Sequence, residues 1–363
     1  MKTSMKIKPT YSVSKSVVPE ALSGRVRTPF AVILGSPAEV IHLLKALPVS
    51  GAVCFQMDLH QAEKLQEMLT AENIEATVRV EADLWDLGPN FSTAIYLPAR
   101  NGERELKIDM LEQGFHILNP SGQFLVWSAH PHDSLFPDLL KKIYDKVHAH
   151  YHKDGSFFWC QRIKDRPRRR HEITFQCRVN KSESLRFLSR PGTFSYGQFD
   201  EGGRALCEAM SIRPGEHVLD IGCGCGTNGV FAWQKAGPNG KITFMDSNVR
   251  AIQLAKLNAE ANGVTNFEVI ASATGKGLAP RSFDVAIANP PYFANHSIGQ
   301  YFIEKSRELI KPDGSFFMVT KQPNEMVQLM SDLGFDVEGA ELRGYTVLMH
   351  RGPAARQDME ANQ

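Results

Sequence analysis

A four-residue segment, Asn289-Pro290-Pro291-Tyr292, combines residue types that could hold and activate a planar nitrogen. An exocyclic amine conjugated to a ring is a poor nucleophile, because its lone pair is delocalised. The Asn289 side-chain oxygen and the backbone carbonyl of Ala288 or Pro290 could accept its two N–H bonds and aim the lone pair at an electrophile. Consecutive prolines fix φ and keep the preceding residues extended, so these acceptors are preorganised. Tyr292 offers a ring on which a base could stack.

The position of this segment in the chain strengthens the interpretation. Asparagine and proline also favour turns that simply end a strand, so the four letters alone are ambiguous. Here the segment closes an apolar run, Phe283–Ala288, which predicts a β-strand. Open α/β sheets bind ligands at the carboxyl ends of their strands, where Asn289 stands. We therefore interpret Asn289, Pro290 and Tyr292 as catalytic residues.

A glycine-rich turn upstream predicts the site of a cationic cofactor. The apolar strand Val218–Ile221 runs into a turn that contains Gly222, Gly224 and Gly226, and then into a predicted helix. Glycine permits the tight turn and a close approach of the backbone to a ligand. The spacing also fits a nicotinamide dinucleotide fingerprint, which is weak by itself. Asp220 at the strand end would repel a pyrophosphate, but it suits the cationic methionine end of S-adenosylmethionine (SAM).

Two further strands supply candidate contacts to the adenosine of SAM. Asp246 ends the next strand and could accept hydrogen bonds from both ribose hydroxyls, a role that SAM and NAD enzymes share. A third strand over 267–270 is followed by a segment that lacks the acidic residue with which many SAM enzymes bind the adenine amine. We expect Ser272 or the Ala273 backbone amide to contact adenine instead. Methyl transfer from a sulfonium needs no metal.

Composition predicts a two-domain globular enzyme. The 363 residues are 42% hydrophobic and 22% charged, and the net charge of +1 means that any RNA contact must come from local patches. Six scattered cysteines form no paired CxxC motifs, so a zinc site or a disulfide framework is not expected. No apolar segment is long enough to span a membrane, and the N-terminus lacks a signal-peptide core, which favours the cytoplasm.

The two halves of the chain repeat one order of elements. Short apolar runs alternate with helical stretches, which predicts an α/β fold. Predicted strands of the first half cover 30–34, 52–57, 93–97 and 123–127. The segment Gly51–Asp58 resembles Gly240–Asp246 with one extra residue, and each precedes a predicted helix. Any two α/β domains look somewhat alike, but the collinear order leads us to favour a duplication.

The duplication predicts two tandem Rossmann-like domains. Their expected bounds are a lead-in over 1–28, a first domain over 29–180, a second over 181–353 and a polar tail over 354–363. Leu97 stands as far before Pro120 as Asn289 stands before Pro312, so we take Leu97 as the counterpart of Asn289. Leucine has no side-chain amide, so the first domain lacks this acceptor.

The first domain also lacks a cofactor loop. Its segment Ile33–Pro37 has one glycine and no preceding acid, so we expect this domain to bind no SAM. Asp58 would then be a structural relic. Our hypothesis is that the first domain positions RNA or supports the second.

Two polar segments near the domain boundary could bind a ligand or could simply be exposed to solvent. The basic run Arg162–His171 could hold RNA phosphates or could be a solvated linker. We interpret His148, His150 and His152 as surface residues, because no carboxylate-rich partner for a metal site is evident.

With these motifs in place, the sequence resembles the ribosomal RNA guanine-N2 methyltransferases. The resemblance rests on the glycine loop, on Asn289–Tyr292, on Gly192–Ser195 and on Arg343–Leu348, and it covers about 190–352. It extends loosely to the first half, because that family has a degenerate N-terminal copy of the domain. It implies class I methyltransferase domains, each with a mostly parallel sheet flanked by helices, and the strand order 3-2-1-4-5-7-6 in the C-terminal one. It also implies SAM as cofactor and 2-methylguanosine formation in rRNA, with the small subunit favoured.

The resemblance also implies a substrate site. Phe194 and Ser195 would lie near SAM or the target base, and Pro291 and Tyr292 would contact that base. Tyr292 occupies a position that often holds phenylalanine, and either ring can stack. The implied partner is rRNA or a ribosomal subunit, bound by a monomer without metal or membrane contact.

Three alternatives to guanine-N2 methylation remain open from the sequence. Adenine-N6 and protein-glutamine methyltransferases also use an Asn-Pro-Pro-aromatic motif. An RNA-binding assembly factor that has lost catalysis is a third possibility. The intact set of candidate cofactor and catalytic residues argues against a loss of catalysis: Asp220, Gly222, Gly224, Gly226, Asp246 and Asn289.

Overall fold

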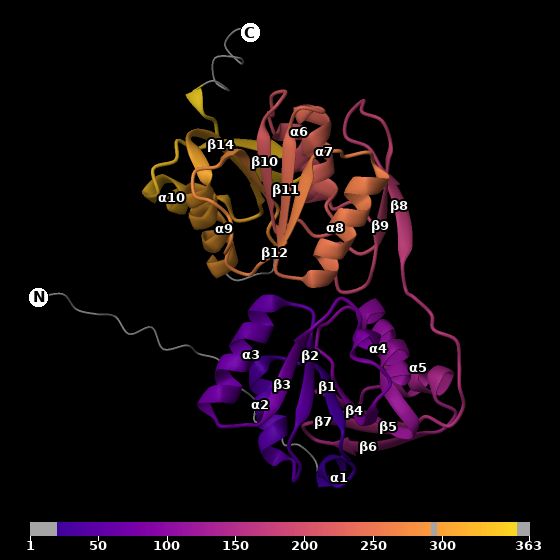
Figure 1. Cartoon of the computed structure of the whole chain (residues 1–363). Coiled ribbons are helices and arrows are strands. Elements are labelled where there is room, and N and C mark those ends of the chain that lie inside the picture. The colour runs from indigo at the N-terminus through magenta and orange to yellow at the C-terminus, as the bar shows by residue number, and fades with distance from the viewer. Residues whose placement is uncertain (1–19, 292–295, 354–363) are drawn as a thin grey trace, which may run out of the picture.

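A computed structural model describes residues 20–291 and 296–353 and shows two α/β domains, one stacked on the other (Figure 1). Each domain contains a seven-stranded sheet, ordered β3-β2-β1-β4-β5-β7-β6 in the first and β12-β11-β10-β13-β14-β16-β15 in the second. Numbered from its own first strand, each sheet has the order 3-2-1-4-5-7-6. The predicted fold class and strand order are therefore confirmed.

The first domain is built from residues 20–161. Its strands are β1 (Phe30–Leu34), β2 (Ala52–Gln56), β3 (Ala76–Val80), β4 (Phe91–Leu97), β5 (Leu118–Ser128), β6 (Val147–His152) and β7 (Gly155–Gln161). Its helices are α1 (Glu20–Ser23), α2 (Pro37–Ala46), α3 (Leu59–Ala71), the 3-10 helix η1 (Leu84–Leu87), α4 (Arg104–Ile117) and α5 (Leu135–Ile143). The three histidines that we interpreted as surface residues lie at alternate positions of the edge strand β6: His148, His150 and His152.

The second domain repeats this plan after a two-stranded hairpin. Its strands are β8 (Ile173–Cys177), β9 (Leu185–Ser189), β10 (His217–Ile221), β11 (Lys241–Asp246), β12 (Phe267–Ala271), β13 (Phe283–Ala288), β14 (Ile310–Thr320), β15 (Glu338–Leu342) and β16 (Tyr345–His350). Its helices are α6 (Glu201–Ala209), α7 (Thr227–Ala236), α8 (Val249–Ala261), α9 (His296–Leu309) and α10 (Pro323–Asp332).

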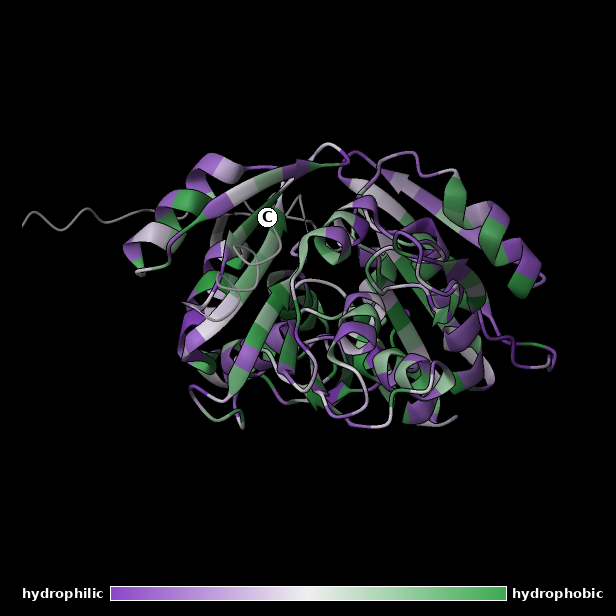
Figure 2. Ribbon diagram, turned by 90° about the horizontal axis from the view of Figure 1, so that it is seen from above, coloured by the Kyte–Doolittle hydropathy of each residue, from purple (hydrophilic) through white to green (hydrophobic). Residues whose placement is uncertain are grey.

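Apolar side chains cover both faces of each sheet, as parallel strands require. The first sheet has one buried cluster on each face, and so has the second. Figure 2 shows the corresponding concentration of hydrophobic residues in the central strands. No helix in the described part of the chain is long and apolar enough to cross a bilayer.

The buried cores of the two domains extend beyond the predicted bounds of the first domain at both of its ends. Leu22, within the predicted lead-in, is fully buried in the core of the first domain. The predicted boundary at 180 falls inside the β8–β9 hairpin. Cys177 and Phe187 of this hairpin belong to the core of the second domain.

The structure corrects the alignment of the two copies at one position. β2 ends at Gln56 and β11 ends at Asp246, and the helix after each strand is capped two residues later, by Asp58 and Asn248. Gln56 is therefore the counterpart of Asp246, whereas Asp58 is the counterpart of Asn248. The sequence comparison was wrong here because it matched acid to acid, although the acid of the first copy stands two residues beyond its strand, at the helix cap.

Candidate active site

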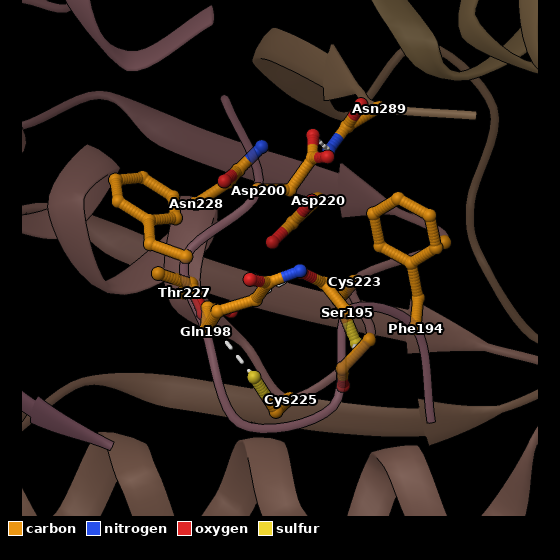
Figure 3. A pocket seen from close by; sticks show the side chains of 13 residues that line it. Phe194, Ser195, Gln198, Asp200, Asp220, Cys223, Cys225, Thr227, Asn228 and Asn289 are labelled. Carbon is orange, nitrogen blue, oxygen red and sulfur yellow. Dashed lines mark hydrogen bonds between the residues drawn. The ribbon is translucent and has the colours of Figure 1, made fainter. Parts of the chain in front are cut away.

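The predicted site residues meet at the carboxyl edge of the second sheet. A cavity of about 550 Å³ opens there. Its lining includes Phe194, Gly222, Gly224, Asp246, Ser272, Ala273, Asn289 and Pro291. A smaller hollow beside it is bordered by Phe194, Ser195, Asp220 and Asn289, among others (Figure 3). Tyr292 lies outside the described residues.

The glycine turn is shaped by positive φ angles and close contacts. Gly226 has φ +85°, and a Cβ placed on it would lie 3.0 Å from the Ala255 Cα. Gly222 has φ +68°, and its Cβ would lie 2.7 Å from the Phe302 ring. Both positions therefore require glycine, for conformation and for space. Gly224 has φ +55°, but the nearest atom to an added Cβ is Phe194 Cβ, at 3.9 Å.

Asp220 is buried beneath this turn. Asp220 is only 2% exposed, and its Oδ2 accepts a hydrogen bond from the Gly229 amide at 2.8 Å. The pKa of Asp220 is raised to about 7, mainly by burial and in smaller part by the nearby Asp246 carboxylate, against the opposing effect of the Gly229 bond. A cationic group in the adjacent hollow would favour the ionised form of this carboxyl.

Asp246 connects the glycine turn to helix α8. Its Oδ2 accepts from the Gly224 amide at 2.9 Å and its Oδ1 from the Asn248 amide at 2.8 Å. The pKa of Asp246 is raised to about 6, mainly by burial and in smaller part by Asp58 of the first domain, against the effect of these two bonds. The carboxylate is thus fixed in orientation at the end of β11, where the predicted ribose site lies.

Asn289 is held by a residue that the motif search did not identify. Its Nδ2 donates to the Asp200 Oδ2 at 3.1 Å, and Figure 3 shows the two side chains pointing toward one another. Asp200 is the N-cap of α6 and accepts from the Gly203 amide at 2.8 Å. A Cβ on Gly203 would lie 3.2 Å from Asn289 Nδ2, so this helix start packs directly on the amide.

The Asp200 contact fixes which end of the Asn289 amide faces the substrate. An ionised carboxylate only accepts hydrogen bonds, so the NH2 group must be the end that faces Asp200. The Oδ1 atom then lies on the opposite side of the amide. The sequence could have marked Asp200 as a helix cap, but its contact with Asn289 depends on the tertiary fold.

Phe194 lies between the two hollows, and Ser195 borders the smaller one. Phe194 is 40% exposed and borders both of them. Ser195 has φ +56°, and its hydroxyl donates to the Gln198 carbonyl at 3.2 Å. A large exposed aromatic ring beside the cavity offers a stacking surface for a planar ligand.

The equivalent edge of the first domain is closed by side chains. A Cβ on Gly35 would lie 2.9 Å from Leu97 Cβ and Cδ1, and Leu97 is 5% exposed. The Gln56 side-chain amide donates to the Gly35 carbonyl at 3.1 Å. The counterparts of the glycine turn, of Asp246 and of Asn289 thus pack against one another.

The basic run after the first domain is partly neutralised by it. Arg166 pairs with Glu112 at 3.8 Å, and Arg170 pairs with Asp83 at 3.2 Å. The guanidinium groups of Arg168 and Arg170 both lie 5.5 Å from the Trp85 ring centre. The run is therefore an ordered strap along η1 and α4, and its RNA contact stays a prediction.

The second half of the chain is similar to a family of methyltransferases. Residues 184–349 match the family model of the methyltransferase small domain. The matched residues lie within the predicted second domain, whose bounds stay a prediction.

Individual relatives carry the same assignment. The chain is 32% identical over 139 residues to ribosomal RNA small subunit methyltransferase C of Pseudomonas aeruginosa (strain LESB58), covering 37% of this chain and 41% of that protein. It is 32% identical over 152 residues to the protein of the same name from Hahella chejuensis (strain KCTC 2396), covering 41% and 44%. The matched segments span less than half of these relatives.

A solved structure matches the fold across both domains. It is the N2-guanosine methyltransferase of 16S rRNA from T. thermophilus, in complex with AdoMet and guanosine. The TM-score is 0.72, the sequence identity is 17%, and the match covers 89% of this chain and 88% of that one. The tandem arrangement of the two domains is therefore shared with this protein.

Proposed function

We propose that this protein transfers a methyl group from SAM to the exocyclic N2 of a guanosine in ribosomal RNA, with small-subunit rRNA favoured. The main support is the Asn289 amide, which Asp200 holds in one orientation at the edge of the cavity that Asp246 borders. The similarity to small subunit methyltransferase C proteins favours guanosine over adenine or protein glutamine as the substrate.

The cavity residues fit SAM in shape and charge. Gly222 borders this cavity, and a Cβ on it would lie 2.7 Å from the Phe302 ring, which borders the cavity as well. Asp220 would face the methionine amine, Asp246 the ribose hydroxyls, and Ser272 or the Ala273 amide the adenine. When bound, SAM supplies a methyl group activated by its sulfonium.

The protein's own contribution is to orient the target amine. We assign the two N–H acceptors to Asn289 Oδ1 and to the backbone carbonyl of Ala288 or Pro290. These acceptors favour a pyramidal nitrogen whose lone pair faces the methyl group. Phe194, Pro291 and Tyr292 would hold the base in place by stacking. Neutral Asn289 is a weak base, so the proton leaves late, to water or a nearby group.

The proposed substrate also determines where the reaction takes place and with which partner. A guanosine within folded rRNA must be exposed or flipped out before its N2 can reach Asn289. We place the enzyme in the cytoplasm, with rRNA or a ribosomal subunit as its partner, acting as a monomer.

The proposal is tested by incubating the protein with tritiated SAM and, in parallel, deproteinised RNA, free subunits and assembled ribosomes. Digestion to nucleosides should yield labelled 2-methylguanosine in at least one reaction. Asn289→Ala should lower turnover by at least about 100-fold while SAM binding persists. Methyladenosine as the sole product, or label in protein alone, would contradict the guanosine assignment.

A further inference from the structure

The first domain contributes directly to the proposed cofactor cavity. Asp58, His60 and Gln61, at the start of α3, line the same cavity as Asp246 and Ala273. The two sheets meet at their carboxyl edges (Figure 1). The closed edge of the degenerate domain therefore lies against the open edge of the catalytic one.

The two domains meet through equivalent loops. The Leu59 amide donates to the Ser247 carbonyl at 2.9 Å, and the Val249 amide donates to the Met57 carbonyl at 2.9 Å. These reciprocal bonds form a short antiparallel bridge centred on Asp58 and Asn248. Because the loops are counterparts, the contact is pseudo-symmetric, as in an isologous dimer.

A side-chain bond reinforces the bridge next to Asp246. The Ser247 hydroxyl donates to Asp58 Oδ2 at 2.5 Å, and Asp58 Oδ1 accepts from the Gln61 amide at 2.9 Å. Asp246 is itself tied to Gly224 and Asn248. The segment 246–248 is thus held on one side by the glycine turn and on the other by the first domain.

The segment that bears Phe194 is anchored in the same way. The Gly192 amide donates to Glu103 Oε2 of the first domain at 3.1 Å, and its carbonyl accepts from Asn248 Nδ2 at 2.8 Å. A Cβ on Gly192 would lie 3.1 Å from Met57 Cε. The first domain therefore contacts two of the segments that border the cavity.

We infer that the degenerate domain completes the SAM site: Asp58 positions the ribose-binding segment through Ser247, and His60 and Gln61 form the wall beside the adenosyl group. The inference rests on the proposed function, because it names SAM as the ligand. Asp58 is a positioning residue in this scheme. It replaces the interpretation of Asp58 as a relic.

The test compares SAM affinity among full-length variants by isothermal titration calorimetry. Ser247→Ala removes the donor, and Asp58→Ser removes the acceptor while keeping an N-cap for α3. Each should weaken SAM binding by roughly tenfold, and the double variant should be no weaker than the single ones, because both lose one interaction. His60→Ala combined with Gln61→Ala should weaken binding about threefold.

A matched control separates this effect from general destabilisation. Ser36→Ala removes the N-cap of α2 in the same domain, and Ser36 does not belong to the cavity lining. This variant should lose thermal stability but keep wild-type SAM affinity. Affinities within twofold of wild type for both Ser247→Ala and Asp58→Ser, or additive losses in the double variant, would overturn the inference.

The wild-type titration keeps the two proposals distinguishable. Tight binding by the wild type with unchanged variants would overturn the role of the first domain and leave the proposed function standing. Failure of the wild type to bind SAM would overturn the proposed cofactor, and this inference with it.

Discussion

At the scale of single residues, Asp200 determines how Asn289 presents its amide. Asp200→Asn retains a good helix cap but replaces an obligate acceptor with a group that can also donate. Asn289 could then rotate and direct its NH2 group at the target amine. We expect kcat to fall by about 10- to 100-fold, with little change in the Kd for SAM.

A second variant separates orientation from helix capping. Asp200→Ser also caps α6, but its shorter side chain cannot reach Asn289. It should lower kcat as Asp200→Asn does, with similar thermal stability. Wild-type kcat in Asp200→Asn would show that Asn289 needs no help to keep its orientation.

The raised pKa of Asp220, about 7, predicts that SAM binding depends on pH. The ionised carboxylate attracts the methionine amine, so affinity should rise as pH increases from 6 to 8 and should fall as the carboxyl takes up a proton. Asp220→Asn should flatten this step and bind SAM weakly throughout. Affinity of the wild type that does not change across this range would contradict the assigned contact.

The same carboxyl should oppose folding at higher pH. Its pKa in the folded protein lies above the usual value of a free aspartate, so the folded state binds the proton more tightly than the unfolded state. Stability from this group therefore declines as pH rises from the unfolded value toward about 7, the opposite of a salt-bridged aspartate. SAM should offset this decline by stabilising the ionised form.

At the scale of elements, the glycine turn offers a matched pair of substitutions. Gly226→Ala combines φ +85° with a 3.0 Å approach to Ala255, so the backbone of the turn or of α8 must shift. Gly224→Ala adds only the cost of a left-handed conformation, on the order of 1 kcal/mol, because its surroundings are open. Thermal unfolding should show the larger loss for Gly226→Ala; equal losses of stability would contradict the packing argument.

Local patterns predicted the elements well but not the contacts between them. The strand Phe283–Ala288 was predicted with its observed bounds, because an apolar run and a following Asn-Pro mark both its ends. Asp200 was missed because helix capping explains it locally, whereas its contact with Asn289 spans 89 positions of sequence. Asp58 was misaligned because an aspartate can end a strand or cap a helix, and the letters alone do not show where the strand ends.

At the scale of the whole molecule, a buried ionic network fixes the two domains together. Arg250 of α8 is fully buried, and it reaches Asp109 at 2.8 Å and Asp83 at 3.4 Å in the first domain. Arg190 of the second domain also pairs with Asp83. Gln113 joins the network through Asp83 and Asp109, at 3.1 and 2.9 Å. No sequence pattern marked these residues, since each pair joins distant parts of the chain.

Arg250→Met should therefore uncouple the domains. The substitution leaves two carboxylates buried beside fewer cations, which typically costs about 3–5 kcal/mol. Urea unfolding should show either that loss or two separate transitions in place of one. SAM affinity should fall as well, because Arg250 lies two positions after Asn248 and the wall formed by α3 would no longer be held in place.

Arg343→Ala provides the control: its ion pairs with Glu201 and Glu208 lie at the surface, and their loss should cost at most about 1 kcal/mol. A single transition of wild-type stability in Arg250→Met would contradict the view that this network fixes the position of the first domain against the active site.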